Sequence, residues 1–230
     1  MILRRILIRI KYLLAKSRLP PSRIIPFLNG VLAFGRWSRQ HPSPVALANK
    51  FKLYHILQTE TIGSDPIDYL EFGVFRGRTF KAWLALNKHP DSRFVGFDTF
   101  EGLPEDWSHL TTLRAKGVFD AGGETPKLDD SRATLVKGTF QETLDSFQAD
   151  WKPRHRLVVH CDADLYSSTL YVLTMLNRIL VPGTIIIFDE FFTVGHEFQA
   201  LLDWTRSYRR SYRILATSNG WDQVALEITA

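Results

Sequence analysis

The sequence of 230 residues contains a single cysteine, Cys161. An internal disulfide is therefore excluded, and this low cysteine content is typical of proteins that stay in a reducing compartment. Cys161 stands in an apolar run, so we interpret it as a small buried hydrophobic residue rather than as a nucleophile.

Acidic residues are absent before Glu60, whereas the same stretch carries eleven of the 29 lysines and arginines. The rest of the chain therefore has 18 basic against 24 acidic side chains and is mildly acidic. Nucleic-acid binding needs basic residues clustered on the folded body. We therefore expect no nucleic-acid partner.

Long apolar runs are absent from residues 1–19. The uncharged stretches there are too short to cross a bilayer, and Arg9 and Lys11 interrupt the apolar region that a signal peptide would need. Isoleucines and leucines recur at helical spacing, mostly opposite six basic residues, which predicts a basic amphipathic helix. This helix either lies on an anionic membrane surface or docks on the protein body or on a second subunit of a homo-oligomer. We expect a cytoplasmic protein, with peripheral membrane contact through residues 1–19 as one of these alternatives.

Prolines at positions 20, 21 and 26 interrupt the chain, so we expect a linker with aromatic anchors through residue 40. Ser43 and Pro44 are typical of a helix start, and we expect a helix from there to about residue 58. The predicted organisation is an N-terminal helix and linker at residues 1–41, followed by one α/β domain at residues 42–230. The length of the chain suits one sizeable core.

A strand, a glycine-rich loop and a helix follow one another from residue 67. The apolar run 67–72 predicts a buried strand, and Gly73 and Gly77 allow a tight turn and the close approach of a ligand. A helical pattern begins at Thr79, so the free N–H groups of its first turn would face that ligand. This order is typical of nucleotide-binding α/β sheets, although the G-x-G-x-x-G spacing of nicotinamide-binding folds is absent.

Predicted strands and helices alternate over the rest of the chain. Residues 99–132 show no clean periodicity and predict an active-site loop. The pattern as a whole predicts an α/β fold with a mostly parallel, seven-stranded sheet, helices on both faces and an antiparallel C-terminal hairpin. Besides residues 67–72, the predicted strands are 94–97, 133–136, 156–161, 184–188, 212–216 and 224–228.

Carboxylates stand at the ends of four predicted parallel strands, where an open α/β sheet binds its ligand. The residues concerned are Glu71, Asp98, the pair Asp162 and Asp164, and the pair Asp189 and Glu190. Asp98 is placed to accept hydrogen bonds from ribose hydroxyls. The other carboxylates would repel each other unless a cation joins them, and Mg²⁺ prefers oxygen ligands. The metal candidates are Asp162, Asp189 and Glu190, with Asp164 in reserve; the alternative is that these residues cap helices and line solvated turns.

Four motifs occur in order along the chain: EFGVFRG at 71–77, GFDTFEGLPE at 96–105, HCDADLYSST at 160–169 and PGTIIIFDEF at 182–191. Together they resemble the macrocin O-methyltransferase (TylF/MycF-like) family. The resemblance implies a Rossmann-like class I methyltransferase fold that uses S-adenosyl-L-methionine. It covers about residues 67–230, which would make residues 42–230 the methyltransferase domain.

The resemblance also implies roles for individual positions in binding S-adenosylmethionine. The residues around its methionine part would be Glu71, Gly73, Gly77 and Thr79, the last near the carboxylate. Asp98 corresponds to the residue on the ribose hydroxyls. The residues that hold the adenine would be Gly138, Thr139 and Phe140.

Asp162, Asp189 and Glu190 correspond to positions that bind a divalent metal, here Mg²⁺, together with adjacent hydroxyls of a sugar. The chain departs from the family pattern in two places. It has Ala163 where Asp-Gly-Asp is common, and Glu190 where a second aspartate is common.

These observations lead to a hypothesis of methyl transfer from S-adenosylmethionine to a hydroxyl of a sugar-like or polyhydroxylated small molecule or glycan. His196 is the candidate general base, because an imidazole titrates near neutrality, and Asp162 acts through the metal. One alternative is a non-catalytic scaffold subunit that binds S-adenosylmethionine. The other is a nicotinamide-dependent oxidoreductase.

Overall fold

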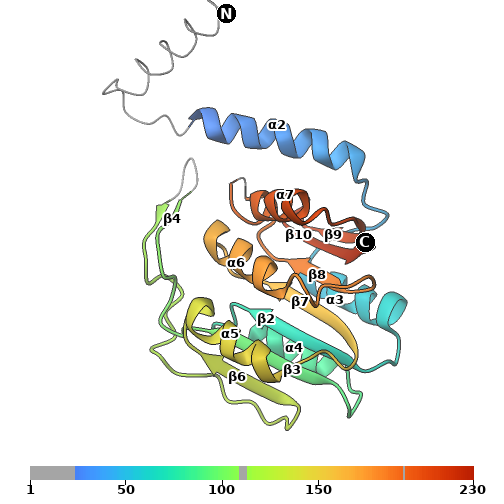
Figure 1. The fold of residues 1–230 in the computed structure, drawn as a ribbon, viewed down its shortest axis with the longest axis vertical. Coiled ribbons are helices and arrows are strands. Elements are labelled where there is room, and N and C mark those ends of the chain that lie inside the picture. The colour runs from blue at the N-terminus through green and yellow to red at the C-terminus, as the bar shows by residue number, and fades with distance from the viewer. Residues whose placement is uncertain (1–23, 109–112, 194) are drawn as a thin grey trace, which may run out of the picture.

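The computed structural model describes residues 24–108, 113–193 and 195–230 (Figure 1). The predicted amphipathic helix at residues 1–19 lies outside this part of the chain. A mixed sheet with strand order β1-β9-β10-β8-β7-β2-β3-β6 forms the centre of the described structure. Its strands are β1 (Ala46–Leu47), β2 (Ile67–Phe72), β3 (Arg93–Asp98), β6 (Ala133–Lys137), β7 (Arg156–Cys161), β8 (Ile185–Phe188), β9 (Tyr212–Ser218) and β10 (Gln223–Ile228).

The sheet confirms the predicted Rossmann-like architecture, except that it has eight strands rather than seven. Strands β6, β3, β2, β7 and β8 run parallel, and β10 pairs antiparallel with both β8 and β9. The additional strand is β1, which pairs parallel with β9 through Ala46 and Thr217. The predicted loop at 99–132 contains a small separate pair, β4 (Trp107–Ser108) and β5 (Leu113–Arg114).

Helices cover both faces of the sheet, as predicted (Figure 1). One buried cluster joins the sheet to α2 (Ile24–Gln40), α5 (Phe140–Asp150), α6 (Tyr166–Leu176) and α7 (Glu197–Tyr208). The other cluster joins it to α3 (Lys50–Ile56), the π-helix η1 (Leu57–Ile62) and α4 (Arg78–Leu86). Strand β2 belongs to both clusters because its side chains alternate, with Tyr69 on the α3–α4 side and Leu70 on the other.

The expected linker before residue 41 is helical from Ile24 to Gln40 and forms α2. Its aromatic anchors explain this helix, because Phe34 and Trp37 are buried against Phe191 and Phe198 of the body. The Trp37 indole N–H also donates a hydrogen bond of 2.7 Å to the Tyr212 hydroxyl. Within the described residues, no helix combines the length and the apolar character needed to cross a membrane.

The helix expected from Ser43 begins only at Lys50. The preceding residues join the sheet instead, where Thr217 N–H donates to the Val45 carbonyl at 2.9 Å. Asn49 then caps α3 by accepting a hydrogen bond of 3.1 Å from Lys52 N–H. The later start places Lys50 at the first position of α3, which matters for the site.

Candidate active site

A cavity of about 450 Å³ lies beyond the carboxyl ends of β2, β3, β7 and β8. This is the edge at which an open α/β sheet binds its ligand. The loop between β2 and α4, the end of β3, the start of α5 and the segments after β7 and β8 all border it. The residues of these segments in the lining include Gly73, Arg78, Thr79, Asp98, Thr139, Phe140, Asp162, Asp164, Asp189 and Glu190.

The loop between β2 and α4 requires glycine at two positions, Gly73 and Gly77. Gly73 has φ of +97°, and a Cβ atom there would lie 1.8 Å from the Asp162 carbonyl oxygen, so the loops after β2 and β7 touch at this glycine. Gly77 has φ of +75° and precedes α4, whose first turn has no side-chain cap. Because Arg78 and Thr79 border the cavity, the positive end of this helix suits a carboxylate such as that of a methionine moiety.

Asp98 fixes the same loop from the end of β3. Its Oδ2 accepts hydrogen bonds from Val74 N–H at 2.8 Å and from Phe75 N–H at 2.7 Å, and its Oδ1 accepts one from Phe100 N–H at 2.7 Å. A carboxylate has about four acceptor positions, so the half-buried Asp98 retains capacity for a hydroxyl of a bound ligand.

His160, on β7, is the centre of a buried hydrogen-bond network. The Tyr69 hydroxyl donates to Glu71 Oε2, and the Tyr54 hydroxyl donates to Asp189 Oδ1 at 3.4 Å. The His160 Nδ1 lies 2.8 Å from the Tyr69 hydroxyl, and Nε2 lies 3.4 Å from the Tyr54 hydroxyl. When both hydroxyl protons point at the carboxylates, each imidazole nitrogen is left to donate to its hydroxyl, and we assign His160 as an imidazolium on this basis.

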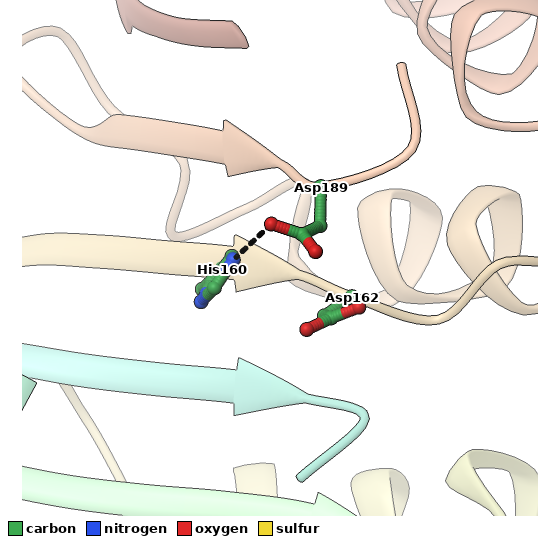
Figure 2. Close-up of side chains that lie close together, drawn as sticks. All are labelled: His160, Asp162 and Asp189. Atoms are coloured by element: carbon green, nitrogen blue, oxygen red, sulfur yellow. Dashed lines mark ion pairs between the residues drawn. The ribbon is translucent and has the colours of Figure 1, made fainter. Parts of the chain in front are cut away.

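The electrostatics of the site agree with this assignment. Burial lowers the pKa of His160, but Asp189 and Glu71 outweigh burial and raise it to about 10. His160, Asp162 and Asp189 form the one group in the described residues whose donor atoms are close enough to hold a metal ion, all within 4.8 Å (Figure 2). A protonated imidazole has no free lone pair for a metal. In this protonation state the group offers the carboxylates of Asp162 and Asp189 as ligands.

Lys50 brings a second cation to the same carboxylates. Its Nζ lies 2.5 Å from Asp189 Oδ2, so Asp189 interacts with Lys50 through one oxygen and with the His160 network through the other. Burial raises the pKa of Asp189, but His160 and Lys50 outweigh it and keep that pKa low. Asp189 is therefore ionised and already paired.

The other carboxyl groups of the site, those of Asp162, Asp164 and Glu190, have too little positive charge nearby to offset their burial. Burial and the charge of Asp189 raise the pKa of Asp162 well above its usual range and that of Asp164 to about 7. Burial and the neighbouring carboxylates Asp222 and Asp164 raise the pKa of Glu190 to about 8. Carboxylate oxygens are the ligands that Mg²⁺ prefers, so Asp162 and Asp189 fit a divalent cation. Glu190 borders the same cavity, but its carboxylate lies outside the group of donor atoms that are within 4.8 Å of one another.

The structure brings most of the predicted site residues to the cavity, but not all of them. Glu71 is fully buried beneath the loop, where it accepts a hydrogen bond of 2.7 Å from Thr79 Oγ1. Gly77 and Gly138 shape the turns before α4 and α5 without bordering the cavity. His196 also lies outside the lining, at the start of α7 with its ring 6.2 Å from that of Trp107.

Sequence reasoning missed three residues that control the charge of the site: Lys50, Tyr54 and Tyr69. Their side chains reach the carboxylates from α3 and from the middle of β2. Spacing gives no signal for Lys50 and Tyr54, because α3 meets the sheet only in the folded protein. Tyr69 and Glu71 are two residues apart in β2 and therefore lie on the same face of the strand. The sequence could have predicted their contact from this spacing.

Comparison with known proteins identifies the family and agrees with the fold. Residues 70–191 match the family model for a methyltransferase domain. The 8-demethyl-8-(2,3-dimethoxy-alpha-L-rhamnosyl)-tetracenomycin-C 4'-O-methyltransferase of Streptomyces olivaceus is 30% identical over 196 residues, which are 77% of this chain and 71% of that protein.

Solved structures show the same fold. The O-methyltransferase NovP has a TM-score of 0.61 at 20% identity, covering 79% of this chain and 80% of its own. The calicheamicin methyltransferase CalS11 has a TM-score of 0.55 at 23% identity over 95% of this chain and 90% of its own. An O-methyltransferase from Bacillus cereus, solved with S-adenosylhomocysteine, has a TM-score of 0.52 at 13% identity over 96% of this chain and 97% of its own.

The chain therefore belongs to the methyltransferase domain family. It is an S-adenosylmethionine-dependent O-methyltransferase.

The imidazolium of His160 yields a prediction about stability. Replacing it in His160→Gln leaves Glu71 and Asp189 buried without their shared cation, so we expect the free energy of unfolding to fall by about 3–5 kcal/mol. Guanidinium denaturation measures this loss, with His55→Gln on the exposed surface of α3 as the matched control. A loss no larger than that of the control would show that His160 is not the cation of this network.

Proposed function

We propose that this enzyme transfers the methyl group of S-adenosylmethionine to a hydroxyl oxygen of a sugar, carried on a small molecule or a glycan. One observation carries the proposal: a single cavity is bordered both by the uncapped start of α4 with Asp98 and by the carboxylate cluster after β7 and β8. The first set of groups suits the donor. The second suits a polyhydroxylated acceptor.

The acceptor class is supported by the relative from Streptomyces olivaceus, whose name states methylation at the 4' position of a rhamnosyl group. The four motifs that resemble the macrocin O-methyltransferase (TylF/MycF-like) family support the same class, and we propose membership of that narrower family. A sugar offers adjacent hydroxyls, which a cluster of carboxylates binds directly or through a shared cation.

For the donor, we propose that Asp98 accepts hydrogen bonds from the ribose hydroxyls and that the first turn of α4 binds the methionine carboxylate. Thr139 and Phe140 border the region assigned to the adenine. Thr139 caps α5 through hydrogen bonds with Glu142, so its side chain is already used and its contribution would come from the backbone. Glu71 supports the loop from below through Thr79 rather than by contact with the donor.

For the acceptor, we propose a divalent cation, Mg²⁺, held by Asp162 and Asp189, whose oxygens lie within 4.8 Å of each other, together with Glu190, which borders the same cavity and would turn toward them. When bound, such an ion lowers the pKa of a coordinated hydroxyl and orients it. Lys50 competes with the ion, because its ammonium group occupies Asp189 Oδ2 at 2.5 Å. A bound ion would share the charge of Asp189 with Lys50, so the two cations would weaken each other's binding.

For the proton of the acceptor hydroxyl, we propose Asp164 as the general base in place of His196. Asp164 borders the cavity, whereas His196 does not. Asp164 is also held in the left-handed region at φ of +58°, directly after the buried Ala163. Its carboxylate can accept the proton as the methyl group is transferred in line to the oxygen.

The function is tested with S-adenosylmethionine tritiated in its methyl group and a panel of rhamnosides. We expect tritium to appear in a sugar O-methyl group, to disappear with EDTA and to return with Mg²⁺. Asp162→Asn is expected to lose transfer while still binding S-adenosylmethionine by calorimetry. Undiminished transfer in EDTA would contradict the metal, and cofactor binding without transfer to any sugar would contradict the acceptor class.

The competition between Lys50 and the cation is tested by metal affinity alone. In Lys50→Met the competing charge at Asp189 is absent, so we expect Mn²⁺ or Mg²⁺ to bind about tenfold or more tightly in calorimetric titration. Lys52→Met, on the exposed side of the same helix, is the matched control and should leave the affinity unchanged. Equal affinities of both variants and the wild type would show that Lys50 does not compete.

Single substitutions distinguish the two candidate general bases, Asp164 and His196. We expect Asp164→Asn to lower kcat by about two to four orders of magnitude, because general-base catalysis contributes about that much. His196→Gln should leave kcat close to that of the wild type. The reverse ranking, measured at saturating donor and acceptor, would return the role to His196.

A further inference from the structure

Helix α2 presents a row of large apolar side chains to solvent. The row consists of Ile24, Ile25, Leu28 and Leu32, with exposed fractions of 57%, 62%, 52% and 68%. Ile24, Leu28 and Leu32 are spaced one turn apart and so share a side of the helix. Among the described residues, four of the nine exposed large hydrophobic side chains belong to this one helix, and we call them the apolar face of α2.

Phe34 and Trp37, on the opposite side of α2, are buried against the body, so this helix is anchored in the fold. In Figure 1, α2 lies along the outside of the molecule, above α7 and the end of the sheet that contains β9 and β10. The apolar face is therefore displayed on a fixed element rather than on a loose segment. A surface of this kind is typical of a docking site.

The charges on α2 indicate what docks there. The helix has no acidic residue, and the exposed Arg36 and Arg39 follow Leu32 at helical spacing on the same side. The absence of acidic residues extends over the whole chain before Glu60. The surface thus combines apolar and cationic groups with no negative charge.

We propose that the apolar face of α2 docks on an anionic membrane surface. Its isoleucines and leucines would enter the interface between headgroups and acyl chains, while Arg36 and Arg39 pair with lipid phosphates. A second copy of the chain fits less well, because it would bring the same face, with arginines and no acidic residue to pair with them.

Docking at α2 would act close to the candidate active site. The Phe34 ring lies 6.5 Å from that of Phe191 and 4.4 Å from that of Phe192, which directly follow Asp189 and Glu190. Phe192 is itself 43% exposed. The loop that carries two of the site carboxylates therefore packs against the inner side of the helix whose outer side would contact the membrane. The docking itself does not depend on the proposed acceptor.

A fluorophore placed on the apolar face tests the proposal in the full-length protein. Cys161 is fully buried and burial raises the pKa of its thiol, so a cysteine introduced by Leu28→Cys is the thiol that reacts with an environment-sensitive dye. We expect a blue shift and brighter emission with vesicles rich in phosphatidylserine, and neither change with phosphatidylcholine alone. The same dye at Leu113→Cys, on the exposed strand β5, is the control and should not respond.

Sedimentation with the same vesicles gives the affinity. Because both side chains are exposed, Leu28→Gln with Leu32→Gln should leave the fold intact and weaken binding by about tenfold or more. Leu113→Gln with Val181→Gln removes equally exposed apolar side chains elsewhere and should have no effect. Unchanged binding of the α2 variant, or no response of the dye at position 28, would overturn the proposal. A blue shift without vesicles that grows with protein concentration would overturn it in favour of a second copy.

Discussion

The carboxylates at the ends of β2, β7 and β8 share one edge of the sheet around the buried positive charge of His160. Glu71 and Asp189 reach this charge through Tyr69 and Tyr54, whose hydroxyls donate to the carboxylates and accept from the imidazolium. Transferring a carboxylate from water into the protein interior costs free energy, and the nearby imidazolium offsets that cost. The glycine loop depends on the same charge, since Glu71 also holds Thr79 at the first turn of α4.

The register of the parallel strands explains how one histidine serves both sides of the site. Glu71 and His160 are direct partners in the pairing of β2 with β7, and β7 in turn pairs with β8, which leads into Asp189. Tyr69 lies two residues before Glu71, on the same side of β2. The network is therefore built largely from the interior of the sheet, and only Tyr54 and Lys50 reach it from α3. The positions of these side chains are therefore fixed by strands and a helix rather than by flexible loops.

Much of this organisation follows from the sequence because its signals are local. The apolar run from Ile67 and the glycines after it predict β2 and its loop, and the acidic residues after each strand predict the edge where the ligand binds. The missing parts depend on contacts between distant segments. The short strand β1 forms only because β9 offers an edge, and the linker-like stretch before residue 41 is helical because Phe34 and Trp37 find a partner in the body. Lys50 reaches Asp189 across 139 positions of the chain, a distance that spacing rules do not cover.

The contact at Gly73 has a consequence for how this enzyme could change over time or under laboratory evolution. A side chain at this position would collide with the Asp162 carbonyl oxygen, so the loop after β2 and the loop after β7 cannot be remodelled independently. A mutational path that widens or shifts the carboxylate cluster must keep the glycine at position 73, or move both loops together. The shape of the cavity is freer to diversify through the long segment between β3 and β6, which borders it at Gly102, Leu103 and Phe119.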